Sequence, residues 1–249
     1  MNKEGDFMTG DNEYQNSKPI VSLSGLTIGF DSKNPLVKVP DLKIYPGEIV
    51  AITGASGVGK TTLLRTIAGL VSPITGTLEV CNSTLPKLPP RGSIGYIPQR
   101  LGLVRHASVK HNVMMGARAG HTTPYAISPS AVSISRTKDA IERMGLIDKI
   151  DEPIRRLSGG QQRRVATARS LAQSPRLIMA DEFLSELDEE TLNSVLFEVT
   201  EYVRSNQAAL IVVEHDVSRA KSMADRLLVI DDGRVNPFLS ETTALEVNL

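Results

Sequence analysis

The glycine-rich segment "GASGVGKTT", residues 54–62, constrains the fold of this 249-residue chain more than any other stretch. It matches the pattern G-x-x-x-x-G-K-[ST], in which a short loop joins a buried strand to a helix. The preceding "EIVAITG" (48–54) is a β-branched apolar run, and a helical pattern extends from Lys60 to Leu70. The sequence therefore predicts a strand–loop–helix unit.

The residue types in this loop suit phosphate. Glycines at 54, 57 and 59 let main-chain N–H groups approach phosphate oxygens, which a side chain would block. Lys60 can reach the β- and γ-phosphates, and the Thr61 hydroxyl can bind Mg²⁺. We expect the nucleotide to be bound by the whole loop: Gly54, Ala55, Ser56, Gly57, Val58, Gly59, Lys60, Thr61 and Thr62.

Strand and helix patterns alternate over much of the rest of the chain. Strands are predicted at 20–30, 36–45, 76–80, 93–98, 176–181, 209–215 and 226–235. Helices are predicted at 108–118, 131–150, 159–173, 189–204 and 217–223. The late alternation indicates βαβ units and a mostly parallel sheet, so the fold class is α/β. The stretch from about 100 to 156 is interpreted as a helical insert.

Charge and cysteine content exclude some classes. Lys and Arg number 28, as do Asp and Glu, so the formal net charge is zero. A dedicated nucleic-acid binder usually carries a basic excess, and we therefore expect no nucleic-acid partner. The one cysteine, Cys81, excludes an intrachain disulfide and is typical of a reducing compartment.

No apolar run approaches the roughly 20 residues that span a bilayer. The start, "MNKEGDFMTGDNEYQNSKP" (1–19), is polar and lacks the apolar core of a secretory signal. We therefore expect a cytoplasmic protein that begins with a mobile tail at 1–18. Such a protein can still dock on a membrane protein.

A second candidate site follows the apolar run "LIMAD". Asp181 lies at the end of this predicted buried strand, and ligands bind at the carboxyl edge of parallel α/β sheets. Asp181 can hold Mg²⁺ through water, and the adjacent Glu182 can polarise an attacking water. An Asp-Glu pair at a strand end is by itself usually a solvated turn, but the upstream phosphate loop favours the catalytic interpretation.

The segment "LSGGQ" (157–161) lies where a long helix is predicted to begin. Its serine hydroxyl and free N–H groups would form a second anion site. Because the chain already has one phosphate loop, we expect Ser158, Gly159, Gly160 and Gln161 to contact the γ-phosphate of a nucleotide held by another subunit. The alternative is simple N-capping by Ser158, which needs one residue only.

Together, "GASGVGKT", "LSGGQ" and "LIMADE" resemble the ATP-binding cassette (ABC) ATPases, the motor subunits of ABC transporters, over about residues 20–236. The resemblance implies ATP and Mg²⁺ as ligands. It also implies a P-loop NTPase core with an N-terminal antiparallel β subdomain and an inserted helical subdomain at about 100–165. The cassette domain would span 19–236, followed by a short tail at 237–249.

The resemblance implies roles for four further residues. Gln99, in "YIPQ", matches the glutamine that contacts Mg²⁺ and the attacking water. His215, in "VVEHD", matches the switch histidine that contacts the γ-phosphate, and Asp188, in "SELD", matches an aspartate that reaches across the dimer. Phe30 falls where the family places an aromatic on adenine, although it can also be an ordinary strand-end residue.

The chain departs from the family pattern at two positions. Phe183 replaces the proline that commonly follows the catalytic glutamate, and Glu186 replaces the usual alanine of the next loop. Proline there supplies main-chain shape and no chemistry, so we expect hydrolysis to survive. Phe183 is expected to tilt the loop that contains Asp188.

The resemblance also implies partners. A second ATPase subunit, expected to be another copy of this chain, would complete an ATP-sandwich dimer. Separate transmembrane permease subunits would carry the solute. A solute-binding protein would join an importer. "GLVRHASVKHNVMMGAR" (102–118) resembles phosphonate-type importer ATPases weakly, and exporters remain open.

Two functions of other classes stay as alternatives. One is a soluble ABC ATPase acting on nucleic acid or ribosomes, which the zero net charge disfavours. The other is a binding module without hydrolysis, which the presence of Glu182, Gln99 and His215 disfavours.

Overall fold

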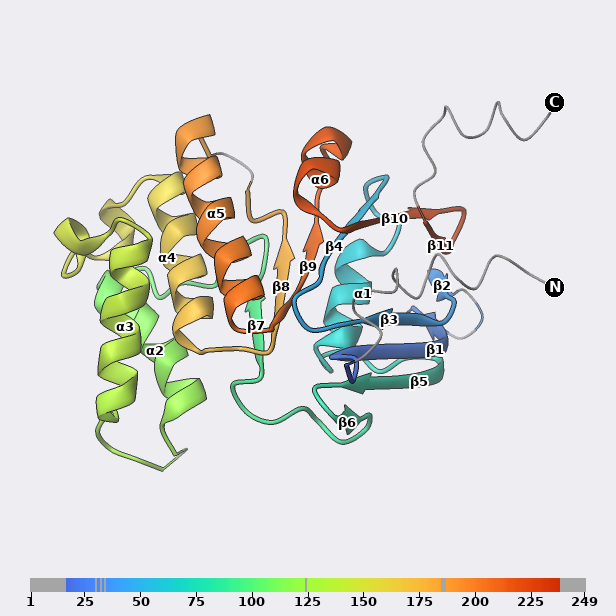
Figure 1. Ribbon diagram of the computed structural model, residues 1–249, viewed down its shortest axis with the longest axis horizontal. Coiled ribbons are helices and arrows are strands. Elements are labelled where there is room, and N and C mark those ends of the chain that lie inside the picture. Colours follow the sequence, from blue (N-terminus) through green and yellow to red (C-terminus); the bar gives the residue numbers. More distant parts are fainter. Residues whose placement is uncertain are drawn as a thin grey trace.

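A computed structural model describes residues 17–29, 31, 33, 35–123, 125–184 and 187–237. One sheet runs through the molecule in the strand order β6-β5-β1-β2-β11-β10-β4-β9-β8-β7, with β3 also paired to β1. In Figure 1 its antiparallel strands lie at one end and helices α2, α3 and α4 at the other. The molecule is therefore a mixed α/β fold with a curled sheet, as predicted.

The strands are β1 (Val21–Ile28), β2 (Val37–Val39), β3 (Leu42–Ile44), β4 (Ile49–Gly54), β5 (Thr75–Val80), β6 (Ser83–Thr84), β7 (Ile94–Ile97), β8 (Leu177–Asp181), β9 (Ala209–Val213), β10 (Arg226–Asp231) and β11 (Arg234–Pro237). The α-helices are α1 (Lys60–Ile67), α2 (Val109–His121), α3 (Ala131–Arg143), α4 (Gly159–Ala172), α5 (Glu189–Ser205) and α6 (Val217–Met223). Two short 3-10 helices, η2 (Ile147–Lys149) and η3 (Ile154–Arg156), precede α4.

Strands β7, β8, β9, β4 and β10 pair in parallel and have cores on both faces. Along β9, Leu210 and Val212 face the core that includes α4 and α5, whereas Ile211 and Val213 face the core beneath α1. All five residues of this strand are buried. Continuous β-branched and leucine runs are what a strand covered on both faces requires.

Strands β1, β2, β3, β5 and β6 form the antiparallel part. β1 pairs antiparallel with β2, β3 and β5, and its buried side chains share a core with Leu63, Leu64 and Ile67 of α1. The helix after the phosphate loop is therefore held between the parallel and antiparallel parts of the sheet (Figure 1).

Helices α2 and α4 approach each other unusually closely. A Cβ on Gly116 would lie 2.0 Å from the Arg169 carbonyl oxygen, and one on Gly120 would lie 2.0 Å from that of Gln173. Only glycine permits such an approach of α2 to the main chain of α4. Val109, Val113 and Ala117, spaced four apart on α2, are fully buried in the same core.

Three predicted elements were wrong in their bounds. The stretch 36–45 divides into β2 and β3, because Pro40 cannot donate a ladder hydrogen bond. The stretch 226–235 is a hairpin of β10 and β11, since Asp232 (φ 44°) and Gly233 (φ 67°) adopt left-handed turn conformations. The helix predicted to reach residue 150 ends at Arg143, and Gly145 (φ 60°) follows.

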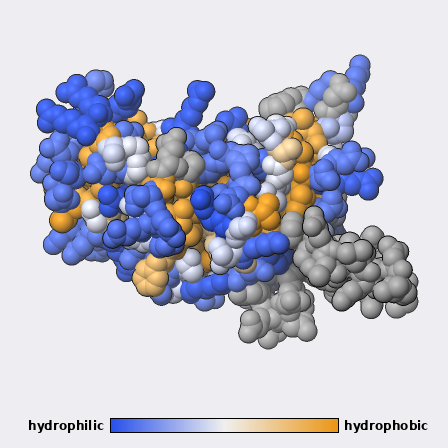
Figure 2. Space-filling model, turned by 90° about the horizontal axis from the view of Figure 1, so that it is seen from above, coloured by the Kyte–Doolittle hydropathy of each residue, from blue (hydrophilic) through white to orange (hydrophobic). Residues whose placement is uncertain are grey.

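Among the described residues, no helix combines the length and the apolar character needed to cross a membrane. Hydrophilic residues cover most of the face in Figure 2, and hydrophobic side chains show between them in narrow strips. Cys81 is buried in the core beside β1. The tails predicted at 1–18 and 237–249 fall almost wholly outside the described residues.

Candidate active site

Part of the predicted site converges at the carboxyl edge of the parallel strands. Asp181, the last residue of β8, pairs with Val213 of β9, which in turn pairs with Ile52 of β4. The phosphate loop leaves β4 two residues later, and His215 follows β9 by two. Three segments distant in sequence therefore meet at one edge of the sheet, where parallel α/β folds bind ligands.

The phosphate loop needs its glycines for two different reasons. A Cβ on Gly54 (φ 148°) would lie 2.5 Å from the Ile230 carbonyl oxygen, and one on Gly59 (φ 113°) would lie 2.7 Å from Val37. A Cβ on Gly57 (φ 79°) would meet no atom within 4 Å, so its left-handed main chain alone favours glycine there. Gly59 begins α1 without a side-chain cap, which leaves first-turn N–H groups available for an anion.

Lys60 curls back over the loop that precedes it. Its Nζ donates to the carbonyl oxygens of Gly54, at 2.7 Å, and Ala55, at 2.9 Å. The residue is 6% exposed, and burial lowers the pKa of this ammonium. Since an ammonium has three N–H donors, one remains for a phosphate oxygen.

Thr61 and Asp181 form a pair that fits a hard divalent cation. The Thr61 Oγ1 donates to Asp181 Oδ2 at 2.8 Å. The other carboxylate oxygen, Oδ1, is buried and has no hydrogen-bond partner, and burial raises the pKa of this carboxyl. A buried oxygen without a partner is costly. A Mg²⁺ ion, which prefers oxygen ligands and completes its shell with phosphates and water, would satisfy it.

Glu182 lies between the two other predicted catalytic residues. Its Oε2 accepts from Gln99 Nε2 at 2.8 Å, and its Oε1 lies 2.6 Å from His215 Nε2. Gln99 comes from the loop after β7 and His215 from the turn after β9, so the tertiary fold assembles this trio. Both partners aim polar hydrogens at one carboxylate, which fixes its orientation.

The main chain at Glu182 is held in an uncommon conformation. Its φ of 53° lies in the left-handed region, which costs a non-glycine residue about 1–3 kcal/mol. The Glu182 N–H donates to the Val213 carbonyl at 3.1 Å, and Arg163 Nη1 donates to the Glu182 carbonyl at 3.3 Å. These two bonds hold the carboxylate at the sheet edge.

The segment Leu157–Gln161 begins α4. Ser158 is the N-cap, its Oγ accepts from the Gln161 N–H, and the Gln161 Oε1 accepts from the Ser158 N–H. Within one chain, therefore, the capping alternative is correct for Ser158, and Gln161 completes the capping box. The predicted contact of this segment with a nucleotide of another subunit stays a prediction.

Asp188 also has a capping role in this chain. It is the N-cap of α5 and accepts from the Thr191 N–H at 2.9 Å, a bond that lowers its pKa. Phe183 is 1% exposed and belongs to the core around α4 and α5, so this departure from the family pattern fills the interior. Phe30 and Glu186 lie outside the described residues.

Two arginines of α4 contact the site but were not predicted from the sequence. Arg163 donates to the Glu182 carbonyl, as described above. Arg169 donates to the carbonyls of Leu101 and Gly102, directly after Gln99. Their acceptors are main-chain oxygens, which leave no residue-type pattern in a sequence. Arg163 is buried and Arg169 is half-buried, but burial is a property of the folded chain, so no sequence signal could have distinguished them from Arg164 of the same helix.

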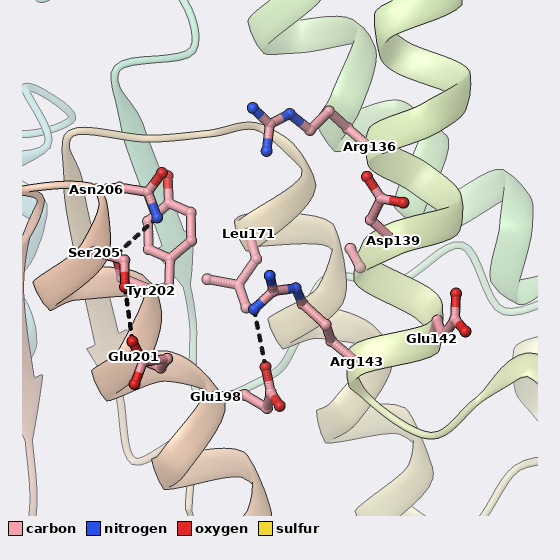
Figure 3. Close-up of a pocket in the computed structure, with 11 residues that line it drawn as sticks. Arg136, Asp139, Glu142, Arg143, Leu171, Glu198, Glu201, Tyr202, Ser205 and Asn206 are labelled. Carbon is pink, nitrogen blue, oxygen red and sulfur yellow. Dashed lines mark hydrogen bonds and ion pairs between the residues drawn. The ribbon is translucent and has the colours of Figure 1, made fainter.

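A separate cleft of about 690 Å³ lies between α3 and α5 (Figure 3). Charged side chains line it, and an ion pair between Arg143 of α3 and Glu198 of α5 spans it at 3.3 Å. None of its lining residues belongs to the phosphate loop or to the Glu182 cluster, which consists of Glu182, Gln99 and His215. Cavity size therefore does not identify the candidate active site, whereas converging polar groups do.

Three features define a P-loop nucleotide-binding fold: a glycine loop before a helix, an aspartate at the end of a neighbouring strand, and the Glu182 cluster. Comparison with known proteins refines this class. Residues 37–185 match the family model described as ABC transporter. The chain belongs to the ABC transporter family.

Several relatives are named as import ATP-binding proteins. The chain is 34% identical over 227 residues to the putative 2-aminoethylphosphonate import ATP-binding protein PhnT of Salmonella typhimurium, a match that covers 90% of this chain and 59% of that protein. It is 36% identical over 208 residues to the L-cystine transport system ATP-binding protein TcyN of Escherichia coli, covering 78% and 80%. The chain thus spans less than two thirds of the length of PhnT.

Solved structures agree with this assignment. The post-hydrolysis dimer of the ATP-binding cassette MJ0796 bound to ADP and Pi superimposes with a TM-score of 0.75 at 28% identity, covering 86% of this chain and 96% of that one. An inward-facing putative metal-chelate type ABC transporter gives a TM-score of 0.77 at 25% identity, covering 90% and 85%.

Proposed function

We propose that this chain is the ATP-hydrolysing subunit of an ABC transporter, in which ATP binding and hydrolysis drive separate membrane subunits. The observation that supports hydrolysis most directly is the Glu182 carboxylate, held between Gln99 and His215 at the same sheet edge as the phosphate loop. The competing function, a binding module without hydrolysis, gives no reason for this arrangement.

In this proposal the loop from Gly54 to Thr62 binds the phosphates through main-chain N–H groups, and Lys60 adds the charge-assisted contact. Mg²⁺, when bound, would be held by Thr61, Asp181 and the amide oxygen of Gln99, and would neutralise phosphate charge.

Glu182 then acts on the attacking water. Its carboxylate accepts a proton as the water oxygen bonds to the γ-phosphorus and the bond to the ADP oxygen breaks. Gln99 and His215 keep the carboxylate in place, and His215, at the exposed end of the cluster, is available for the γ-phosphate. The family resemblance assigns Phe30 to the adenine.

The proposed working unit is a dimer. The start of α4 would close over the nucleotide of a second ATPase subunit, through Ser158, Gly159, Gly160 and Gln161. Asp188 would reach across the interface. The dimeric cassette named above supports this proposal. We also propose the division into tails at 1–18 and 237–249 and a cassette at 19–236 with its helical subdomain at about 100–165.

The proposed partners are transmembrane permease subunits and, for an importer, a solute-binding protein. The chain would then work in the cytoplasm, on the inner face of the membrane. The printed names of PhnT and TcyN support import. They also name chemically different solutes, so similarity does not single out the phosphonate class. The nucleic-acid alternative has no support in these names.

Two measurements test the proposal. The purified chain should release phosphate from ATP in the presence of Mg²⁺, and a Glu182→Gln variant should not. Coexpression with the membrane proteins encoded beside it should give a complex that copurifies from detergent. An inactive parent chain would refute the hydrolytic function. A chain that hydrolyses ATP but never joins a membrane complex would refute the transport function.

A further inference from the structure

The loop after β7 turns sharply just beyond Gln99. Leu101 (φ 48°) and Gly102 (φ 58°) both adopt left-handed conformations, and the Leu101 N–H donates back to the Pro98 carbonyl at 2.8 Å. Left-handed main chain is unfavourable for leucine, so this turn needs support from outside the loop.

Arg169 of α4 supplies that support. Its Nη2 donates to the Leu101 carbonyl at 2.6 Å, and its Nη1 donates to the Gly102 carbonyl at 2.7 Å. Both distances are short, as expected for a charged donor. Burial lowers the pKa of this guanidinium, and the two carbonyl dipoles offset part of its desolvation.

The main chain of Arg169 makes a second connection. Its carbonyl oxygen is the atom that Gly116 of α2 approaches, where a Cβ would lie 2.0 Å away. One residue of α4 thus contacts both the loop after Gln99 and the helix that follows this loop. Because α4 begins at Gly159, directly after its N-cap Ser158, the loop after Gln99 and the start of α4 are joined through one helix.

We propose that Arg169 is a positioning residue for Gln99. By donating to the carbonyls of Leu101 and Gly102, Arg169 keeps the Gln99 amide hydrogen-bonded to the Glu182 carboxylate. The same bonds make the orientation of α4 depend on the position of the loop after β7. The inference rests on the proposed ATPase function, to which it adds a residue that touches neither nucleotide nor water.

Arg169→Lys is the most informative variant, because lysine keeps the charge but cannot present two guanidinium N–H groups to adjacent carbonyls. Arg118→Lys is the matched control. Arg118 Nη2 likewise donates to two consecutive loop carbonyls, those of Ala126 at 2.6 Å and Ile127 at 3.4 Å, in the loop between α2 and α3.

We expect Arg169→Lys to lower kcat for ATP hydrolysis about 10-fold, the effect of losing one charge-assisted hydrogen bond. ATP affinity should stay within about twofold, because Gly54–Thr62 is untouched. Arg118→Lys should leave both values at the parent level. Since a purely structural role would predict the same loss in any background, the decisive test is a cycle with Gln99→Ala.

If Arg169 acts through Gln99, Arg169→Lys should have no further effect on kcat in the Gln99→Ala background. Effects that multiply would refute the positioning role, as would an unchanged kcat in the single variant. Amide hydrogen exchange in the nucleotide-free protein is an independent readout. Exchange of the Leu101 amide should accelerate about 10-fold in Arg169→Lys and should not change in Arg118→Lys. If Arg169→Lys and the parent exchanged this amide at equal rates, the proposal would be overturned even if the parent hydrolysed no ATP.

Discussion

Replacing Glu182 by glutamine should remove hydrolysis while preserving the geometry of the site. The glutamine amide oxygen can still accept from Gln99 Nε2, and its NH₂ can donate to His215 Nε2 once that histidine carries its proton on Nδ1. The variant therefore loses mainly the ability to take a proton. General base catalysis contributes about 10²–10⁴-fold, which raises the barrier by about 2.7–5.4 kcal/mol.

The assay is steady-state phosphate release with ATP and Mg²⁺, together with nucleotide affinity by equilibrium titration. Affinity should change by less than about threefold, because no atom of the phosphate loop is altered. Glu189→Gln, which removes an exposed carboxylate from the first turn of α5, is the control for loss of charge. If the Glu182→Gln variant kept a kcat within threefold of the parent, Glu182 would not be the base.

Three other predictions follow from the same geometry. Lys60→Ala should weaken ATP binding by about 1.5–3 kcal/mol, or roughly 10- to 150-fold in Kd, and an unchanged Kd in the titration would remove Lys60 from the phosphate site. Gly159→Asp should leave the ATP affinity of the monomer unchanged. In the Glu182→Gln background it should abolish the ATP-induced dimer on size-exclusion chromatography, because the new carboxylate would face the γ-phosphate held by the partner subunit. Capping alone predicts a normal dimer and an unchanged or slightly higher melting temperature, since an acid in the first turn of α4 is favourable. Gly116→Ala should lower the free energy of unfolding by about 1–3 kcal/mol in urea titrations, because its Cβ would lie 2.0 Å from the Arg169 carbonyl oxygen, and wild-type stability would contradict the close α2–α4 contact.

Prediction from the sequence succeeded where the determining residues are contiguous. The strand–loop–helix unit from β4 to α1 is such a case, since its glycines adopt conformations set by local main-chain geometry. The binding of phosphate by this loop stays a prediction. Asp181 is a second such case, because four apolar residues before it indicate the end of a buried strand. The bounds of β10 and β11 were wrong although the Asp232–Gly233 pair that separates them is a recognised hairpin signal.

The sequence by itself determined the α/β class, the glycine loop between β4 and α1, and the strand end at Asp181, because backbone conformation and hydrophobic pattern are local properties. Only the tertiary structure decided that Glu182 lies between Gln99, 83 residues away, and His215, 33 residues away. It alone also revealed Arg163 and Arg169, whose partners are carbonyl oxygens present at every position of a chain. Which carbonyls an arginine reaches depends on how helices and loops pack, and that packing is set by contacts between residues far apart in sequence.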